Sequence, residues 1–148
     1  MNEKLKRYLD SIGLKGELFV KVENAYRFFT EYLECEIEDI FVSEYINKEG
    51  VREYENIWFF NDDYCYEAKH FIMQEDFDSC VIKNNIDYFS IKKSNFDIIS
   101  NLTADNSRMN LEFRLKNSMV VGDMKASKSN CEQLAIIVKK YFKLNQVI

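Results

Sequence analysis

The hydrophobic pattern of the chain changes its period near residue 39, and this change limits the folds that the chain can adopt. Over residues 17–33, apolar side chains recur every three or four positions, as on the buried face of a helix. Over 40–46 and 52–60, apolar and polar residues alternate, as in strands with one buried face. The helical period returns over 130–144. Helices at both ends of a strand-rich middle indicate the α+β class.

The helical segments have recognisable ends. A first helix is expected from about Asn2 to Ser11, ended near Gly13, and a second over 17–33. The last helix begins with Ser129 and Glu132 at the spacing of a capping box. Its expected buried stripe consists of Leu134, Ile137, Val138 and Tyr141.

The best-specified part of the sheet is a hairpin over residues 108–126. Residues 108–116 alternate without a fault, and Asn117-Ser118 provides a two-residue turn. This turn places apolar or small residues opposite one another along the hairpin, so turn and pattern agree on one register. The predicted pairs are Met109 with Ala126, Leu111 with Met124, Phe113 with Gly122, Leu115 with Val120 and Lys116 with Met119.

Further strands are expected over 64–73, 77–83, 86–92 and 95–100, joined by short polar turns. The predicted fold therefore has two N-terminal helices, then a bent antiparallel meander sheet or partly open barrel of six to eight strands, capped by a C-terminal helix. With 148 residues, one domain is expected over 1–148. Within it, 1–34 is a helical N-terminal segment and 39–148 is the sheet with its capping helix.

Composition excludes several classes of protein. The longest apolar run is five residues, 134–138, far too short for a membrane span or a signal-peptide core. A net charge of −5 argues against nucleic-acid binding. We therefore expect a cytoplasmic protein with no membrane insertion. The 14 Asn, 14 Ile and 15 Lys residues against 5 Arg suggest an AT-rich, bacterial genome.

Charge is unevenly distributed along the chain. Residues 106–148 carry a net charge of +5, whereas residues 31–63 carry −9, with two bases, Lys48 and Arg52. The negative segment fits either an ordinary solvated face or an acidic docking surface for a basic protein or peptide. Its eleven acids are Glu31, Glu34, Glu36, Glu38, Asp39, Glu44, Glu49, Glu53, Glu55, Asp62 and Asp63.

The chain shows no catalytic, metal or cofactor motif. Zinc ligands usually come in close pairs, and no two of the four cysteines, Cys35, Cys65, Cys80 and Cys131, lie that close. We expect reduced, largely buried thiols. The single histidine, His70, is expected on the third strand, partly buried and facing away from Cys65. With four glycines in the chain, no glycine-rich phosphate loop can be built. We therefore expect no catalytic residue, no metal and no cofactor.

The strands around residue 60 are rich in aromatic side chains. Such a group fits a packed core, and it also fits the lining of a small-ligand cavity inside the sheet. The residues are Trp58, Phe59, Phe60, Tyr64 and Tyr66.

Residues 39–148 resemble the bacterial pleckstrin-homology-like domains. The resemblance rests on Ile86-Asp87-Tyr88-Phe89-Ser90-Ile91, which fits the family's Ile-x-Tyr-x-x-Ile segment, on the hairpin 108–126 and on the helix 130–144. It implies a bent sheet of about seven strands with a C-terminal helix at one end. The family's best-known activity is phosphoinositide binding through Lys and Arg in the first two strands. Here these strands and their loop carry four acids against two bases, so we expect no phosphoinositide binding.

Three functions remain open at this stage. The first is a non-catalytic module that recognises protein or peptide, including by strand addition at an open sheet edge. The second is a small acidic inhibitor or immunity-type protein that neutralises a basic partner. The third is a small-ligand carrier or enzyme that uses the interior of the sheet. The sequence predicts neither the partner nor the oligomeric state.

Overall fold

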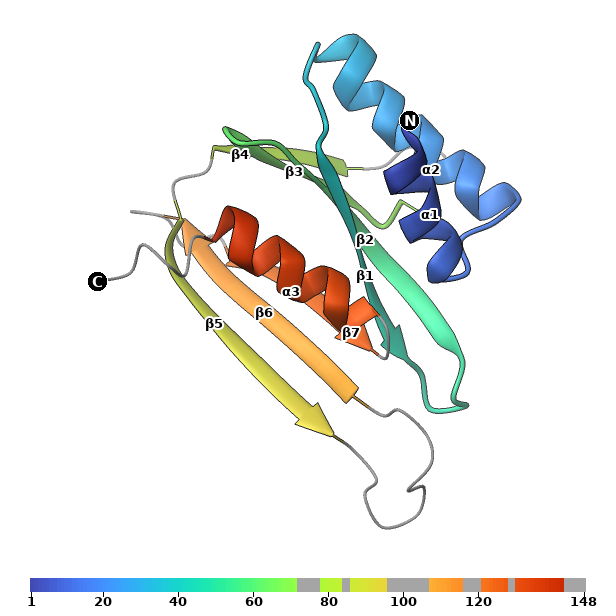
Figure 1. Ribbon diagram of the computed structural model, residues 1–148, viewed down its shortest axis with the longest axis vertical. Helices are drawn as coiled ribbons and strands as arrows, with labels where there is room; N and C mark the ends of the chain where they lie inside the picture. The colour runs from blue at the N-terminus through green and yellow to red at the C-terminus, as the bar shows by residue number, and fades with distance from the viewer. Residues whose placement is uncertain (72–77, 84–85, 96–106, 116–120, 128–129, 143–148) are drawn as a thin grey trace. The chain divides into compact units, whose positions relative to one another are not determined.

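The computed structural model describes residues 1–71, 78–83, 86–95, 107–115, 121–127 and 130–142 (Figure 1). The chain forms two compact units, one of residues 1–42 and 54–84 and one of residues 43–53 and 85–148. The elements in chain order are α1 (Glu3–Ser11), α2 (Glu17–Arg27), η1 (Phe28–Tyr32), β1 (Asp39–Ile46), β2 (Arg52–Phe60), β3 (Tyr64–Lys69), β4 (Asp78–Lys83), β5 (Ile86–Asn95), β6 (Ser107–Leu115), β7 (Val121–Ser127) and α3 (Asn130–Tyr141).

The first unit begins with helices whose ends follow local chemistry. The Asn2 side chain caps α1 by accepting a hydrogen bond of 2.9 Å from the Leu5 N–H. Gly13, at a φ of 84°, allows the tight turn between α1 and α2. The expected α-helix over 17–33 is wrong in its last part, because α geometry ends at Arg27 and the π-helix η1 follows. The Leu33 N–H reaches back to the Phe28 carbonyl, five residues earlier, at 3.3 Å.

The first sheet is antiparallel between β2, β3 and β4, with strand order β1-β2-β3-β4. Phe59 of β2 lies opposite Tyr66 of β3, which sets two large rings side by side on one face. Side chains of the first unit also fasten α1 and its following turn to the strands. The Val42 N–H donates to the Tyr8 hydroxyl at 2.9 Å, and the Tyr54 hydroxyl donates to the Ile12 carbonyl.

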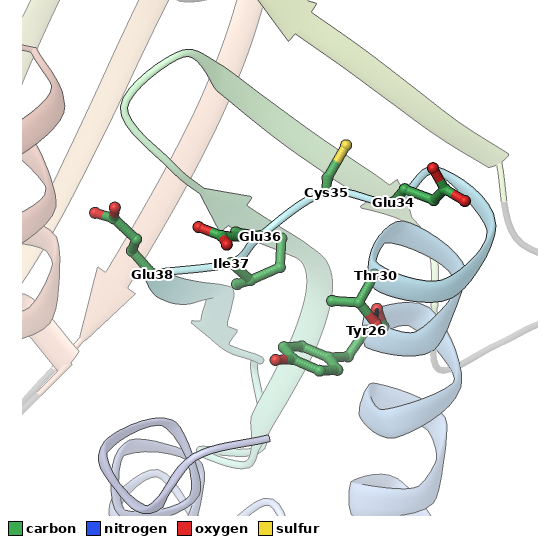
Figure 2. A pocket seen from close by; sticks show the side chains of 7 residues that line it. All are labelled: Tyr26, Thr30, Glu34, Cys35, Glu36, Ile37 and Glu38. Atoms are coloured by element: carbon green, nitrogen blue, oxygen red, sulfur yellow. Dashed lines mark hydrogen bonds between the residues drawn. The ribbon is translucent and has the colours of Figure 1, made fainter.

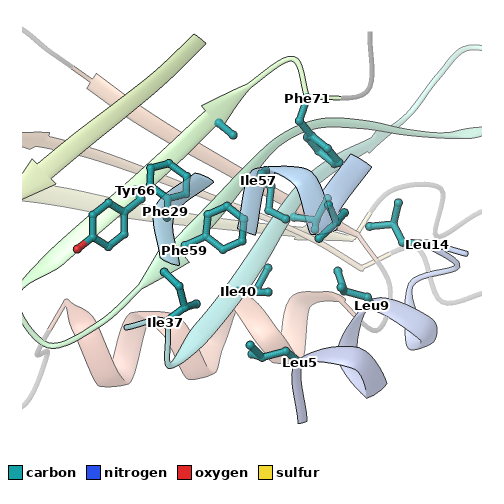
Figure 3. Close-up of a cluster of buried hydrophobic side chains, with 14 of the residues drawn as sticks. Leu5, Leu9, Leu14, Phe29, Ile37, Ile40, Ile57, Phe59, Tyr66 and Phe71 are labelled. Atoms are coloured by element: carbon teal, nitrogen blue, oxygen red, sulfur yellow. The ribbon is translucent and has the colours of Figure 1, made fainter. Parts of the chain in front are cut away.

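One hydrophobic cluster fills the first unit (Figure 3). Alternate residues of β1 to β3 face the helices because side chains along a strand point to opposite faces in turn. The helices contribute residues at the spacing of one helical face. The buried members are Leu5, Leu9, Ile12, Leu14, Val22, Ala25, Phe29, Ile37, Ile40, Val42, Ile57, Phe59, Tyr66, Ala68 and Phe71.

The second unit contains the antiparallel sheet β5-β6-β7 and the helix α3. The predicted hairpin register is confirmed where the structure describes it: Met109 pairs with Ala126, Leu111 with Met124 and Phe113 with Gly122. The predicted C-terminal helix is also confirmed, and it contacts β6 and β7. All four residues of its predicted stripe are buried: Leu134, Ile137, Val138 and Tyr141.

The predicted fold is right in its α+β class and wrong in its arrangement. The strands that the structure describes form two sheets, of four and three strands, in place of one bent meander or partly open barrel. The N-terminal helices bury the face of β1 to β3, whereas the expectation gave the covering role to the C-terminal helix. The pattern could not reveal this, since an apolar stripe shows that a helix is covered and not which sheet covers it.

The third strand also differs from the prediction over 64–73. It ends at Lys69, and His70 is an exposed turn residue with a φ of 52°. The His70 N–H donates to the Asn56 side chain at 3.2 Å. The expectation of a partly buried strand histidine is therefore wrong. The alternating pattern continued past the end of the strand because Phe71, although it lies in the turn, is buried like a strand residue.

Some predictions lie outside the described residues. These are most of the strand over 95–100, the cap at Ser129, the hairpin pairs of Leu115 and Lys116, and the side chain of Cys80. None of the helices in the described ranges has the length and apolarity required to cross a bilayer.

Phe29 allows a direct test of this core. Its side chain is fully buried, with ring centroids 5.2 Å from Phe59 and 5.0 Å from Tyr66. We expect Phe29→Ala to lower the free energy of unfolding by about 3–5 kcal/mol, because it removes a buried ring and leaves a cavity. Urea unfolding followed by circular dichroism measures the change.

Tyr32 is the matched control, because it is an aromatic residue of the same π-helix with 77% of its surface exposed. Tyr32→Ala should change the unfolding free energy by no more than about 0.5 kcal/mol. Equal losses in the two variants would contradict the core described above.

Candidate functional site

An open pocket of about 540 Å³ lies in the first unit where η1 ends (Figure 2). Tyr26 and Thr30 line it from the helix, and the segment that runs from the helix into β1 lines the other side. The segment contributes Glu34, Cys35, Glu36, Ile37 and Glu38.

Three features hold this segment in place. Glu34, in the left-handed region at a φ of 52°, turns the chain out of the helix. The Cys35 N–H then donates to the Phe29 carbonyl at 3.0 Å. Farther along, the Glu38 N–H donates to the Phe60 carbonyl at 2.8 Å, and the Asn61 side-chain amide donates to the Glu36 carbonyl at 2.9 Å. Glu36 and Glu38 therefore both bind the segment to the end of β2.

These hydrogen bonds also bring two acidic parts of the sequence together. Asn61 begins the turn between β2 and β3, and its side-chain oxygen accepts hydrogen bonds from the N–H groups of Asp63 and Tyr64 at 2.9 and 2.7 Å. The turn acids consequently lie beside the pocket segment. We call the resulting group the acidic rim, which consists of Glu34, Glu36, Glu38, Asp62 and Asp63.

The acids of the pocket segment occupy alternate positions. Glu34 and Glu36 are exposed, whereas Ile37 is 8% exposed and belongs to the hydrophobic cluster. In an extended chain, alternate side chains point to the same side, so Glu36 and Glu38, which follow the turn at Glu34, share one face (Figure 2). Among the residues that the structure describes, no ion pair involves Glu34, Glu36 or Asp63.

One base that contacts this segment, Lys4, already has an acidic partner. The Lys4 ammonium lies 2.6 Å from the Asp39 carboxylate, which is buried, and donates to the Glu38 carbonyl at 3.4 Å. Asp39 was counted with the acidic segment in the sequence, yet its buried carboxylate pairs with the exposed Lys4 side chain. A buried carboxylate needs such a partner.

Tyr66 forms a hydrogen bond with Cys35 of the pocket segment, and the pKa of its hydroxyl is raised. Burial raises the pKa of the Tyr66 hydroxyl, and a hydrogen bond with Cys35 raises it further. The Asn61 side-chain amide, 3.1 Å from the hydroxyl, acts in the opposite direction. The Tyr66 hydroxyl is therefore a neutral hydrogen-bonding group at physiological pH.

The pocket presents carboxylates, hydroxyl groups and a thiol, and none of its lining residues in the described part of the chain is cationic. Such a set suits the binding of a cationic group by charge and hydrogen bonding. No three His, Cys, Asp or Glu side chains in the described part of the chain are placed to hold a metal ion.

A second polar group lies within the second unit, around Glu44. Its side chain is completely buried, and its Oε2 lies 2.9 Å from Nε of Arg52. The Ser127 hydroxyl donates to Oε1 at 3.0 Å, and the Ser127 backbone and the Asn130 side chain add further hydrogen bonds. One carboxylate thus joins the end of the β1–β2 hairpin to β7 and to the start of α3.

The neighbouring Ser43 strengthens this junction, because its hydroxyl accepts a hydrogen bond of 3.0 Å from the Lys125 N–H. Residues two apart on a strand direct their N–H groups to the same edge. The N–H groups of Lys125 and Ser127 are therefore both satisfied at one edge of β7, by side chains of β1 and without a strand ladder. This is a structural device, and we assign it no ligand.

The structure sorts the predicted site residues into distinct groups. Of the eleven acids, Asp39 and Glu44 are buried in ion pairs and five form the acidic rim. The aromatic residues Trp58, Phe59, Phe60 and Tyr66 are buried, while Tyr64 is 38% exposed. Cys35, Cys65 and Cys131 are thiols without disulfide bonds, and Cys35 is only partly buried.

Sequence reasoning counted the acids and missed their grouping. The alternation of Glu36 and Glu38 with Cys35 and Ile37 was a usable signal for an acidic face on this segment. No sequence signal connects Glu36 with Asp63, because a turn between two strands brings them together. No family model, curated protein or solved structure matches this chain.

The pH dependence of stability tests the buried Glu44. Burial, as the largest cause, raises the pKa of the Glu44 carboxyl above its ordinary value of 4.5, although Arg52 and Ser127 lower it. In the pH range just above 4.5, the native state therefore binds more protons at this site than the unfolded state. The contribution of Glu44 to stability is full below pH 4.5 and decreases as the pH rises through the native pKa.

We expect the unfolding free energy of the wild type, relative to that of Glu44→Gln, to fall as the pH rises above 4.5. Glu53→Gln is the control with the opposite sign. Hydrogen bonds from Tyr45 and Asn47 lower the pKa of the exposed Glu53 carboxyl, so its contribution is lost as the pH falls. Urea unfolding at a series of pH values measures both differences. If the unfolding free energy of the wild type, relative to that of Glu44→Gln, rose as the pH increased above 4.5, the raised pKa of Glu44 would be contradicted.

Proposed function

We propose that the protein is a non-catalytic binding module that recognises a basic protein or peptide at the acidic rim. The observation that carries the proposal is that Glu34, Glu36 and Glu38 line one open pocket, and that Asn61 bonds the acidic turn between β2 and β3 to the same segment. Acids scattered over a surface are not held together by hydrogen bonds. Here the hydrogen bond from the Asn61 side chain to the Glu36 carbonyl connects the two acidic segments.

Electrostatics supports a basic partner in two ways. A patch of one charge attracts oppositely charged molecules over about 8–10 Å at physiological salt and raises their association rate. At closer range, each exposed carboxylate can pair with a Lys or Arg side chain for about 0.2–1 kcal/mol. Several such pairs around one pocket provide specificity that a single pair lacks.

A narrower second candidate is an inhibitor or immunity-type protein whose basic partner is an enzyme. The acidic rim supports it on the same grounds, and the two candidates differ only in whether binding blocks the partner's activity. A ligand carrier receives less support in the first unit, because the rings of Phe29, Phe59 and Tyr66 pack against one another there.

The resemblance to pleckstrin-homology-like domains stays a proposal and does not carry this function. The expected absence of phosphoinositide binding stays a prediction as well. The acidic rim agrees with it, since a phosphorylated head group would meet carboxylates there.

The proposal is tested with a peptide of eight residues in which arginine and threonine alternate. We expect the intact protein to bind this peptide in isothermal titration calorimetry, more weakly as the salt concentration rises. The double variant Glu34→Gln/Glu36→Gln should bind it about 2- to 30-fold more weakly, since it removes two exposed carboxylates worth about 0.2–1 kcal/mol each.

Glu132→Gln, on the exposed side of α3, is the control for loss of charge elsewhere, and it should leave the affinity unchanged within error. A peptide of alternating glutamate and threonine should not bind. Equal binding of the basic peptide by the wild type and by the double variant would overturn the proposal, as would no binding at all.

A further inference from the structure

Ile37 lies in the middle of the pocket segment, and its peptide groups are unusual. The residue is 8% exposed and lines the pocket, but neither its N–H nor its C=O forms a hydrogen bond among the described residues. Buried backbone groups are nearly always paired, with protein or with water. The open groups of Ile37 therefore indicate a position that a partner or solvent must fill.

The neighbours of Ile37 show which way these groups point. The Glu36 carbonyl and the Glu38 N–H are both bonded to the end of β2. In an extended chain, successive residues direct their backbone groups to opposite edges. The N–H and C=O of Ile37 consequently face the edge away from β2, where the segment continues the line of β1.

We propose that this edge accepts an added strand: an extended basic segment of a partner protein pairs antiparallel with Ile37 and places bases beside Glu36 and Glu38. This inference rests on the proposed function and specifies how the basic partner binds. Main-chain hydrogen bonds provide affinity in strand addition, and the alternate side chains provide specificity.

The spacing of the acids selects the partner's sequence. Alternate residues of a strand lie about 6.6–6.8 Å apart on one face, and directly opposite side chains of an antiparallel pair are about 4.5–5.5 Å apart. Bases two residues apart would therefore lie opposite Glu36 and Glu38. The residue between them lies opposite Ile37 and exchanges both hydrogen bonds with it.

Backbone methylation of the probe separates strand pairing from charge attraction. The octapeptide of alternating arginine and threonine is prepared in two further forms, one with every threonine N-methylated and one with every arginine N-methylated. If the peptide binds shifted by two residues, the same type of residue, methylated or not, still lies opposite Ile37. A shifted register therefore gives the same expected result. All three forms carry the same side-chain charges.

With the bases beside the two glutamates, the threonines lie opposite Ile37. We therefore expect N-methylation of the threonines to weaken binding about two- to tenfold, the effect of losing a hydrogen bond. N-methylation of the arginines, whose N–H groups face away from Ile37, should leave the affinity unchanged. Calorimetry with the intact protein measures all three affinities.

The failure of this inference is distinguishable from failure of the proposed function. If all three peptides bind equally and in a salt-dependent manner, the acidic rim binds bases without strand pairing, and the inference is overturned alone. The same holds if the arginine-methylated form is the weaker one. If the unmodified peptide does not bind, both the function and the inference are overturned.

Discussion

The packing of Phe29 against Phe59 and Tyr66 is the interaction on which the first unit depends. It fixes the helical segment to the sheet at the residue where α geometry has just given way to a π-helix. The Phe29 carbonyl then accepts the Cys35 N–H, which ends the helical segment and starts the extended one. An aromatic contact in the core thus sets where the pocket segment begins and which face of it is buried.

The two units handle carboxylates in different ways. In the second unit, Glu44 is removed from water and held by Arg52, Ser127 and Asn130, so its charge is used to join strands and a helix. In the first unit, Glu34 and Glu36 of the acidic rim are exposed and line a pocket. A buried carboxylate that is already paired cannot contact a basic group of a partner, whereas an exposed carboxylate can still attract one. The contrast gives Glu44 a structural role and is consistent with the recognition that we propose for the rim.

The sequence predicted the parts of the fold that local periodicity determines. The hairpin register at Phe113 and Gly122 and the buried stripe of α3 follow from patterns of two and of three to four residues. The division into two sheets did not follow, because periodicity contains no information on which strands pair at a distance. The sequence predicted that this part of the chain is acidic. It did not predict which acids lie together, because their grouping depends on the hydrogen bond between Asn61 and the Glu36 carbonyl.

Hydrogen exchange at two neighbouring amides tests the central claim most directly. The Glu38 N–H is bonded to Phe60, whereas the Ile37 N–H has no partner among the described residues. In the free protein, nuclear magnetic resonance should therefore show faster exchange at Ile37 than at Glu38. Saturation with the arginine–threonine peptide should slow exchange at Ile37 and leave Glu38 nearly unchanged. Unchanged exchange at Ile37 in the saturated protein would contradict strand addition at the acidic rim.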